Sequence, residues 1–283
     1  MPAILSIVDI LYVETNIIDQ LFATDLTLTT DDLDIDNEPH HGLTLRNGSQ
    51  SALAIIGENG LVKPIKTKQT IGRISPRAGE QTIYINQLMN HNISMVIATG
   101  PAGTGKTLLA VSAALEIVIN KGPQSRVIMC KSLSEIGPHR MGALPGGLKE
   151  KIHPYVACYE GAIDEYLGDC QQGMIHAMES KGIIEYRPIN ILRGTSIKDA
   201  IIILDEAQNI NKHDMRAICT RVGENSRMFL LGDTRQSDEK YKVNGLKILT
   251  NSELIKKSTL VAHSNLIINQ RSELSKLLDN ALE

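Results

Sequence analysis

The chain has 283 residues, 42% hydrophobic and 22% charged, which is ordinary for a globular protein with room for one large domain or for a core and a small appendage. It has no apolar run of ~18 residues, so we expect no membrane-spanning helix, and its four cysteines form no C-x-x-C pair, which favours reduced thiols in a cytoplasmic protein. The net charge of −3 is unevenly divided, since residues 1–60 carry ten acids and one base while the remainder carries 28 bases and 22 acids, a balance that suits the handling of phosphates.

The first 66 residues predict a small β-rich module. Residues 1–24 are compatible with strand and with helix, and they predict no signal peptide because they lack a basic start and contain acids. Residues 25–41 predict an acidic loop ending in His40 and His41, which we expect to be a solvated pair because no third metal ligand lies nearby. Short alternating runs follow, with a hairpin turn before the last: 43–46, 52–56 and 61–62.

Residues 61–79 form a basic stretch with five bases and no acid. This stretch is the best candidate for contact with a polyanion, and a solvated linker is an equally good interpretation. Residues 81–89 then predict an amphipathic helix that leads into an apolar strand at 95–98.

The strongest motif is GPAGTGKT at residues 100–107, which matches G-x-x-x-x-G-K-[ST] at every fixed position and precedes a helix. Glycines let backbone N–H groups turn toward phosphates, and the helix adds the positive end of its dipole. We therefore predict a nucleotide-binding loop in which Lys106 reaches the terminal phosphates and Thr107 holds Mg²⁺. The expected nucleotide contacts are Gly100, Pro101, Ala102, Gly103, Thr104, Gly105, Lys106, Thr107 and Leu108.

Strands and helices continue to alternate beyond this loop. We predict a strand at 126–130, a glycine- and proline-rich loop at 137–147, helical structure over 148–179 and a strand at 183–186.

An aliphatic run at 200–204 predicts a strand buried on both faces of a parallel sheet. Asp205 and Glu206 follow at its carboxyl end, where such sheets bind ligands. We predict that Asp205 is a Mg²⁺ ligand and that Glu206 deprotonates the attacking water. A helix cap after a core strand would account for one of these acids but not for both.

The third motif, residues 228–236, is another buried strand followed by polar groups, with Gln236 placed to hydrogen-bond a γ-phosphate. Strands are predicted at 259–262 and 266–268, ahead of Arg271 and a C-terminal helix. Arg271 is a candidate for γ-phosphate stabilisation, and a surface arginine is the plainer alternative.

In this order the motifs resemble the PhoH family of ATPases, and more closely the ATPase portion of PIN–PhoH fusion proteins, over residues 43–283. The resemblance implies an α/β P-loop NTPase, a three-layer sandwich with a mostly parallel sheet like the RecA and superfamily 1 helicase cores, at residues 67–283, after a small β-rich module at residues 1–66. No PIN nuclease domain fits in 66 residues, so ribonuclease activity is not implied. The segments that carry the resemblance are GPAGTGKTLLA (100–110), LPGGLKEKIHPY (144–155), LRGTSIKDAIIILDEAQN (192–209), TRVGENSRMFLLGDTRQ (220–236) and NGL (244–246).

The same order resembles the first motor domain of superfamily 1 helicases, which implies further roles. Family members often carry an arginine where this chain has Lys131, which leaves that contact open. Gln81 would recognise adenine, and Arg271 would contact the γ-phosphate. Gln208 corresponds to the glutamine of the helicase D-E-x-Q box, and Gln236 to that of the G-D-x-x-Q box.

The chain has one P-loop, whereas a helicase motor closes ATP between two cores. A second subunit would then complete the site, and a ring is the closed solution for head-to-tail contacts. The resemblance implies a homohexamer, with Arg271, Arg221 or Arg193 acting across its interface.

We therefore predict a Mg²⁺-dependent ATPase that acts on single-stranded nucleic acid, RNA before DNA, and binds no membrane. The scarcity of aromatic residues (seven Tyr, two Phe and no Trp) argues against this partner because it leaves few stacking platforms. An ATP-driven switch acting on a protein partner stays open, as does a phosphotransferase, although the D-E-A-Q motif at 205–208 and the G-D-x-x-Q motif at 232–236 together argue against the latter.

Overall fold

The structure, a computed structural model, describes residues 9–23, 27–65, 69–132, 148–168, 172–189, 192, 196–235, 244–274, 277 and 281. The chain forms two compact units, which are described separately: the first contains residues 1–70, 75–105 and 250–283, and the second contains residues 71–74 and 106–249. None of the helices in the described ranges has the length and apolar character needed to span a bilayer.

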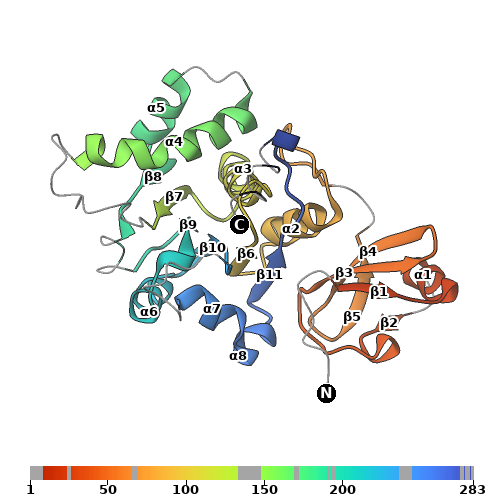
Figure 1. Cartoon of the computed structure of the whole chain (residues 1–283). Coiled ribbons are helices and arrows are strands. Elements are labelled where there is room, and N and C mark those ends of the chain that lie inside the picture. The colour runs from red at the N-terminus through yellow and green to blue at the C-terminus, as the bar shows by residue number, and fades with distance from the viewer. Residues whose placement is uncertain are drawn as a thin grey trace. The chain divides into compact units, whose positions relative to one another are not determined.

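The first unit begins with a five-stranded sheet in the order β1-β3-β4-β5-β2 (Figure 1). Neighbours β3, β4 and β5 are antiparallel, whereas β1 runs parallel to β3. The predicted hairpin turn joins β4 to β5. The strands are β1 (Asp9–Tyr12), β2 (Leu28–Thr29), β3 (Gly42–Asn47), β4 (Gln50–Ile56) and β5 (Leu61–Pro64).

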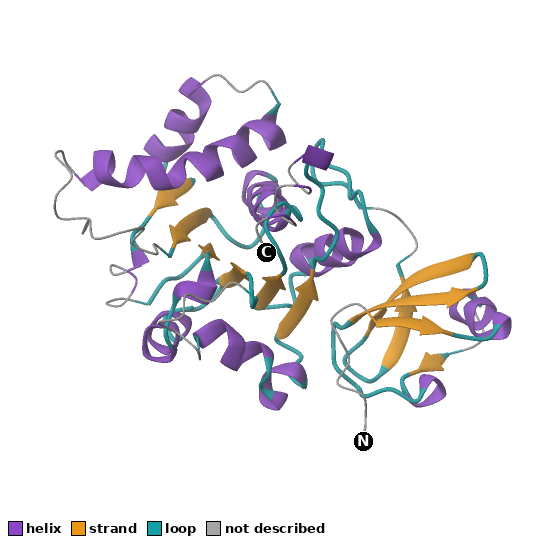
Figure 2. Ribbon diagram, in the orientation of Figure 1, coloured by secondary structure: helices purple, strands orange, loops and turns teal. Residues whose placement is uncertain are grey.

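Alternate side chains of β3 and β4 form the core of this sheet, as the two-residue period of a strand requires. Helix α1 (Thr15–Phe22) lies against the sheet (Figure 2) and contributes Ile18 and Leu21 to the same core. The predicted β-rich N-terminal module is thus confirmed as a sheet, and residues 9–22 hold both a strand and a helix. The buried core side chains of the two strands are Leu43, Leu45, Ala52, Ala54 and Ile56.

Residues 27–41 are more ordered than the predicted loop, because they contain β2 and the 3-10 helix η1 (Asp31–Leu33). The prediction of a solvated His40 is wrong, since this residue is 5% exposed. Its Nε2 lies 2.9 Å from the carbonyl oxygen of Thr259, and its own carbonyl accepts from Gln87 Nε2 at 2.8 Å. Hydrogen-bonded polar groups are stably buried, and nothing in the sequence indicates a partner 219 residues away.

The first unit also contains α2 (Gly79–Met89), β6 (Met95–Thr99), α8 (Glu253–Lys256) and β11 (Val261–Asn265). Strands β6 and β11 are parallel. The prediction of an amphipathic helix at residues 81–89 is wrong, since eight of the eleven residues of α2 are buried. The helix packs against β3 and β4 as well as against β6 and β11. The two strands predicted over residues 259–268 are a single strand, β11, and residues 266–268 lie beyond it.

The second unit has four parallel strands in the order β10-β9-β7-β8. Helices α3, α4 and α5 lie on one side of these strands and α6 and α7 on the other (Figure 1). The strands are β7 (Arg126–Lys131), β8 (Ile184–Tyr186), β9 (Ala200–Asp205) and β10 (Arg227–Gly232). The helices are α3 (Lys106–Ile119), α4 (Leu148–Leu167), α5 (Gln172–Ser180), α6 (Lys212–Cys219) and α7 (Gly245–Thr250).

The predicted α/β fold class is confirmed by these parallel strands and their covering helices. Every residue of β9 and β10 is buried, which explains why both read as continuous apolar runs. The predicted helical stretch over 148–179 is two helices, α4 and α5. The glycine- and proline-rich loop at 137–147 lies outside the described residues.

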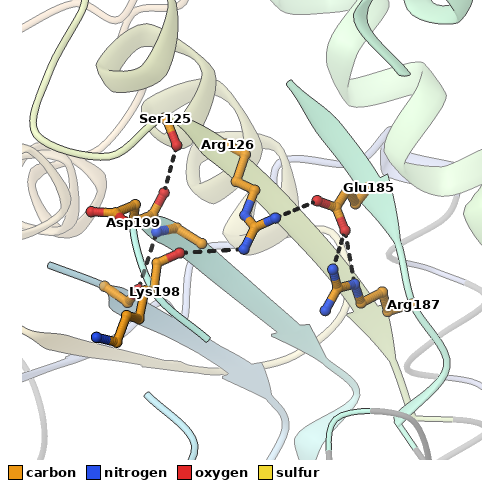
Figure 3. Close-up of polar contacts among 8 residues, drawn as sticks. Ser125, Arg126, Glu185, Arg187, Lys198 and Asp199 are labelled. Carbon is orange, nitrogen blue, oxygen red and sulfur yellow. Dashed lines mark hydrogen bonds and ion pairs between the residues drawn. The ribbon is translucent and has the colours of Figure 1, made fainter. Parts of the chain in front are cut away.

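Charged side chains attach the short edge strand β8 to its neighbour. Glu185 of β8 accepts from Arg126 of β7 at 3.0 Å and from Arg187 Nε at 2.8 Å (Figure 3). All three side chains are between 24% and 33% exposed, so the charges are partly shielded from water. This cluster supplements a ladder of only three residue pairs between the two strands.

Candidate nucleotide-binding and catalytic site

The predicted nucleotide-binding loop follows β6 and leads into α3. Gly100, Gly103 and Gly105 have φ angles of 137°, 80° and 92°, in the region that favours glycine. A Cβ at Gly100 would lie 1.9 Å from the carbonyl oxygen of Leu266, so a side chain is excluded there by close approach as well as by conformation. The loop is therefore shaped by both its glycines and the backbone that packs on it.

Gln81 is bonded to the P-loop through its side-chain amide. Its Nε2 donates to the carbonyl oxygen of Thr104 at 2.9 Å, and its Oε1 accepts from the backbone N–H of Arg77 at 2.7 Å. Gln81 is 4% exposed. These contacts connect the first turn of α2 with the loop. The recognition of adenine by Gln81 stays a prediction.

Residues 266–271, here called the arginine segment, run along the P-loop. The N–H of Leu266 donates to Thr99 O at 2.8 Å, and the N–H of Gln270 donates to Gly103 O at 2.8 Å. A Cβ at Gly103 would lie 2.5 Å from Arg271 Cγ. The side chain of Arg271 thus covers the P-loop at Gly103, within the same unit of the same chain.

In the second unit, Thr107 and Asp205 connect two of the predicted motifs. The Thr107 hydroxyl donates to Asp205 Oδ2 at 3.0 Å, and the Glu206 N–H donates to Asp205 Oδ1 at 2.9 Å. Burial, and then the charge of Glu206, raise the pKa of Asp205, while the two hydrogen bonds lower it. The result is a buried carboxylate that costs free energy when ionised.

Lys106 is surrounded by carboxylates of the same unit. Burial lowers the pKa of this lysine, and the charges of Asp205, Asp233 and Glu206 oppose that shift. An ammonium in this setting is partly removed from water and interacts with negative groups, and a lysine perturbed in this way is a candidate functional residue.

Gln208 connects the second and third motifs. Its Nε2 donates to Glu206 Oε2 at 2.7 Å, and its Oε1 accepts from the N–H of Asp233 at 3.1 Å. Gln208 is 3% exposed. The amide therefore ties the carboxylate of Glu206 to the end of β10. Glu206 itself has φ 55°, a left-handed conformation that is uncommon outside glycine.

The sequence left the contact of Lys131, the last residue of β7, open. Its Nζ lies 3.9 Å from Glu206 Oε1, opposite the oxygen that Gln208 holds, and 3.7 Å from the Sγ of Cys158. This charge next to Glu206 becomes visible only once β7 pairs with β9, because the pairing brings Lys131 level with Asp205.

Several predicted residues lie elsewhere. Gln236 and Arg193 are outside the described residues, so their roles stay predictions. Arg221 is half-buried after α6. In the basic stretch, Lys63, Arg73 and Arg77 are exposed, and Lys66 and Lys68 are outside the described residues.

A protein-family model described as PhoH-like protein matches residues 73–281. Among curated proteins, the chain is 32% identical over 241 residues to Protein PhoH2 of Bacillus subtilis (strain 168), covering 83% of this chain and 54% of that protein. It is 28% identical over 244 residues to Protein PhoH2 of Mycolicibacterium smegmatis, covering 86% and 55%. The chain spans about half the length of these curated relatives.

Two solved structures are also similar to the chain. Pif1 helicase from Candida albicans matches with a TM-score of 0.38 and 17% identity, over 74% of this chain and 44% of that one. The large terminase of a thermophilic bacteriophage, in complex with ADP, matches with a TM-score of 0.39 and 10% identity, over 71% of this chain and 49% of that one.

Proposed function

The chain belongs to the family of PhoH-like proteins and is a P-loop NTPase, and on this premise we propose that it hydrolyses ATP in the presence of Mg²⁺. The observation that carries the proposal is the 3.0 Å hydrogen bond between the Thr107 hydroxyl and Asp205. It brings together the two motifs with which P-loop enzymes hold the metal of a bound nucleotide.

The donor atoms of these two residues suit Mg²⁺. A hydroxyl and a carboxylate are hard oxygen ligands of the kind that this cation prefers. A cation beside Asp205 would also offset the cost of ionising a buried carboxylate. Mg²⁺, when bound, would neutralise charge on the phosphates.

The proposed roles of the other residues follow from their surroundings. Lys106 and the N–H groups of the loop bind the phosphates. The oxygen of a water molecule bonds to the γ-phosphorus while Glu206 accepts a proton from that water. The bond from the γ-phosphorus to the leaving ADP oxygen breaks. Gln208 and Lys131 each hold one oxygen of Glu206, so its carboxylate is oriented before substrate arrives.

We assign Arg271 to the nucleotide of its own chain, because the arginine segment is bonded to the P-loop that precedes it. It would stabilise negative charge on the transferred phosphoryl group. Arg221 and Arg193 then stay as the candidates for action across a subunit interface in the homohexamer that we propose.

Single-stranded nucleic acid, RNA before DNA, is the proposed partner of the ATPase. The motif order and the exposed bases Lys63, Arg73 and Arg77 support it. Stimulation of turnover by single-stranded RNA, lost at high salt, is the expected result. ATP-dependent assembly without any response to RNA or DNA would favour a switch that acts on a protein partner.

The deciding experiment is product analysis with γ-labelled ATP. We expect free phosphate to be released in the presence of Mg²⁺ and not when the metal is chelated. Label transferred to another molecule would instead identify a phosphotransferase, and no turnover under any of these conditions would refute the proposal.

A further inference from the structure

The arginine segment is attached to the rest of the first unit mainly through its backbone. Leu266, at its start, is fully buried, but the side chains of Ile267 and Ile268 are 59% and 49% exposed. Burial of apolar side chains therefore contributes little between Leu266 and Arg271. Backbone hydrogen bonds must supply the attachment.

Every second residue of the arginine segment donates its backbone N–H to a neighbouring part of the unit. The N–H groups of Leu266 and Gln270 donate to backbone carbonyls of Thr99, which immediately precedes the P-loop, and of Gly103, which lies within it. Between them, the N–H of Ile268 donates to a side chain, Glu80 Oε1, at 2.7 Å. A carboxylate thus supplies the acceptor at the point where the P-loop backbone supplies none.

Glu80 is itself an unusual residue for this place. It lies in the first turn of α2 and is only 5% exposed, although glutamate is rarely buried. A buried carboxylate is costly unless hydrogen bonds stabilise it, and a carboxylate accepting from a backbone N–H is a strong, charge-assisted pair. The next residue, Gln81, holds the other part of the loop through Thr104.

We propose that Glu80 is a positioning residue for Arg271. By accepting from Ile268, it holds the arginine segment against the P-loop, so that the guanidinium is presented to the terminal phosphate. Glu80 and Gln81 then act as neighbours with separate tasks, one fixing the segment that carries the arginine and the other fixing the loop. This inference rests on the proposed ATPase function.

The test compares Glu80→Ala with Arg271→Ala and with the double variant. Because a catalytic group displaced by about 1 Å can cost about 10²-fold, we expect Glu80→Ala to lower kcat by roughly that factor and to change KM by less than about threefold. The double variant should be no slower than Arg271→Ala alone, since both changes remove one effect. A double variant much slower than Arg271→Ala, or a rise in KM as large as the fall in kcat of Glu80→Ala, would overturn the inference.

Two conservative variants and one control sharpen the result. Glu80→Gln keeps a carbonyl acceptor and should recover most of kcat, whereas Glu80→Asp keeps the charge but withdraws the acceptor and should not. Glu80→Asp also carries the test if Glu80→Ala fails to fold. The matched control is Glu58→Ala, which removes an exposed glutamate in the turn between β4 and β5 and should leave kcat unchanged.

Hydrogen exchange separates this inference from the ATPase proposal. Without Glu80 as acceptor, the amides of residues 266–271 should exchange about tenfold faster in Glu80→Ala, while those of β11 stay protected. If wild-type protein has no turnover but the exchange result is obtained, the ATPase proposal fails and the attachment stands. Unchanged exchange in Glu80→Ala refutes the attachment whatever the activity.

Discussion

The backbone N–H of Gln270 donates to the carbonyl oxygen of Gly103, so the residue before Arg271 is bonded directly to the P-loop of its own chain. The two positions are 167 residues apart in the sequence, and their contact depends on β11 running parallel to β6. Motif order alone assigns Arg271 to the γ-phosphate, and this hydrogen bond explains how Arg271 is held beside the loop that binds the phosphates. The predictions below test the parts of the site one at a time.

Lys106→Ala should weaken ATP binding. Charge-assisted hydrogen bonds are worth about 1.5–3 kcal/mol each, so we expect a loss of affinity of about 10²-fold. The measurement is titration with a fluorescent ATP analogue, with Lys63→Ala, an exposed lysine of β5, as the control. Equal affinity in the two variants would show that Lys106 does not bind phosphate.

Glu206→Gln should bind ATP with a Kd within about threefold of wild type and lose hydrolysis by about 10²–10⁴-fold, the usual contribution of a general base. Single-turnover phosphate release measures the chemical step directly. The control is Glu224→Gln, which changes an exposed glutamate. If Glu206→Gln turns over normally, another residue must take the proton.

The sequence predicts the strands, the P-loop and the acids of this site because each depends on a local pattern of residues. It does not predict the bonds from Gln208 to Glu206 and Asp233, since they require two strands to be paired first. Glu80 and His40 lie in unremarkable sequence, and their buried roles come from partners 188 and 219 residues away. The amphipathic prediction for α2 failed for the same reason, because a helix covered by two sheets has no face left for water.

Asp205→Asn should abolish Mg²⁺-dependent turnover and yet stabilise the ligand-free protein at pH 7. Burial raises the folded-state pKa of Asp205 above its ordinary value of 3.8, so the folded chain binds the proton more tightly than the unfolded chain. Stability contributed by this group therefore falls as pH rises through the two pKa values and stays reduced at neutral pH. An asparagine has no such dependence.

Phosphate release from ATP in the presence of Mg²⁺ measures the turnover of Asp205→Asn, and urea unfolding of the ligand-free variant at pH 7 measures its stability. The exposed Asp19→Asn is the control for a lost charge. A lower free energy of unfolding in the ligand-free Asp205→Asn variant would contradict the prediction.

His263 should make the protein sensitive to mild acid. Burial, with smaller effects from His41 and Lys256, lowers its pKa from 6.5 to about 4. Between these values the unfolded chain binds a proton that the folded chain does not, so stability is present above pH 6.5 and is lost as pH falls toward 4. His263→Gln should reduce that loss between pH 7 and pH 5 in urea unfolding.

The exposed His213→Gln is the matched control for this slope. The comparison uses the change with pH within each variant, because His263→Gln also alters the contact of Nε2 with Thr99 Oγ1, at 2.9 Å. Identical pH slopes in wild type and His263→Gln would assign the acid sensitivity to other groups.

Glu185→Gln should destabilise the second unit by about 1 kcal/mol, because the partly shielded guanidinium groups of Arg126 and Arg187 would lose their shared charged acceptor. In contrast, Glu224→Gln removes an ion pair with Lys198 whose two side chains are 82% and 60% exposed, and it should have almost no effect. Equal unfolding midpoints for the two variants would show that the edge cluster adds no stability.

The left-handed backbone of Glu206 has a consequence for how this chain could be engineered. A non-glycine residue held at φ 55° costs about 1–2 kcal/mol, and glycine would adopt the same conformation without that cost. Glu206→Gly would relieve that strain, but it would also remove the acceptor of the buried Gln208 Nε2 and the carboxylate proposed to activate water. Any programme that stabilises this chain must screen for turnover at the same time.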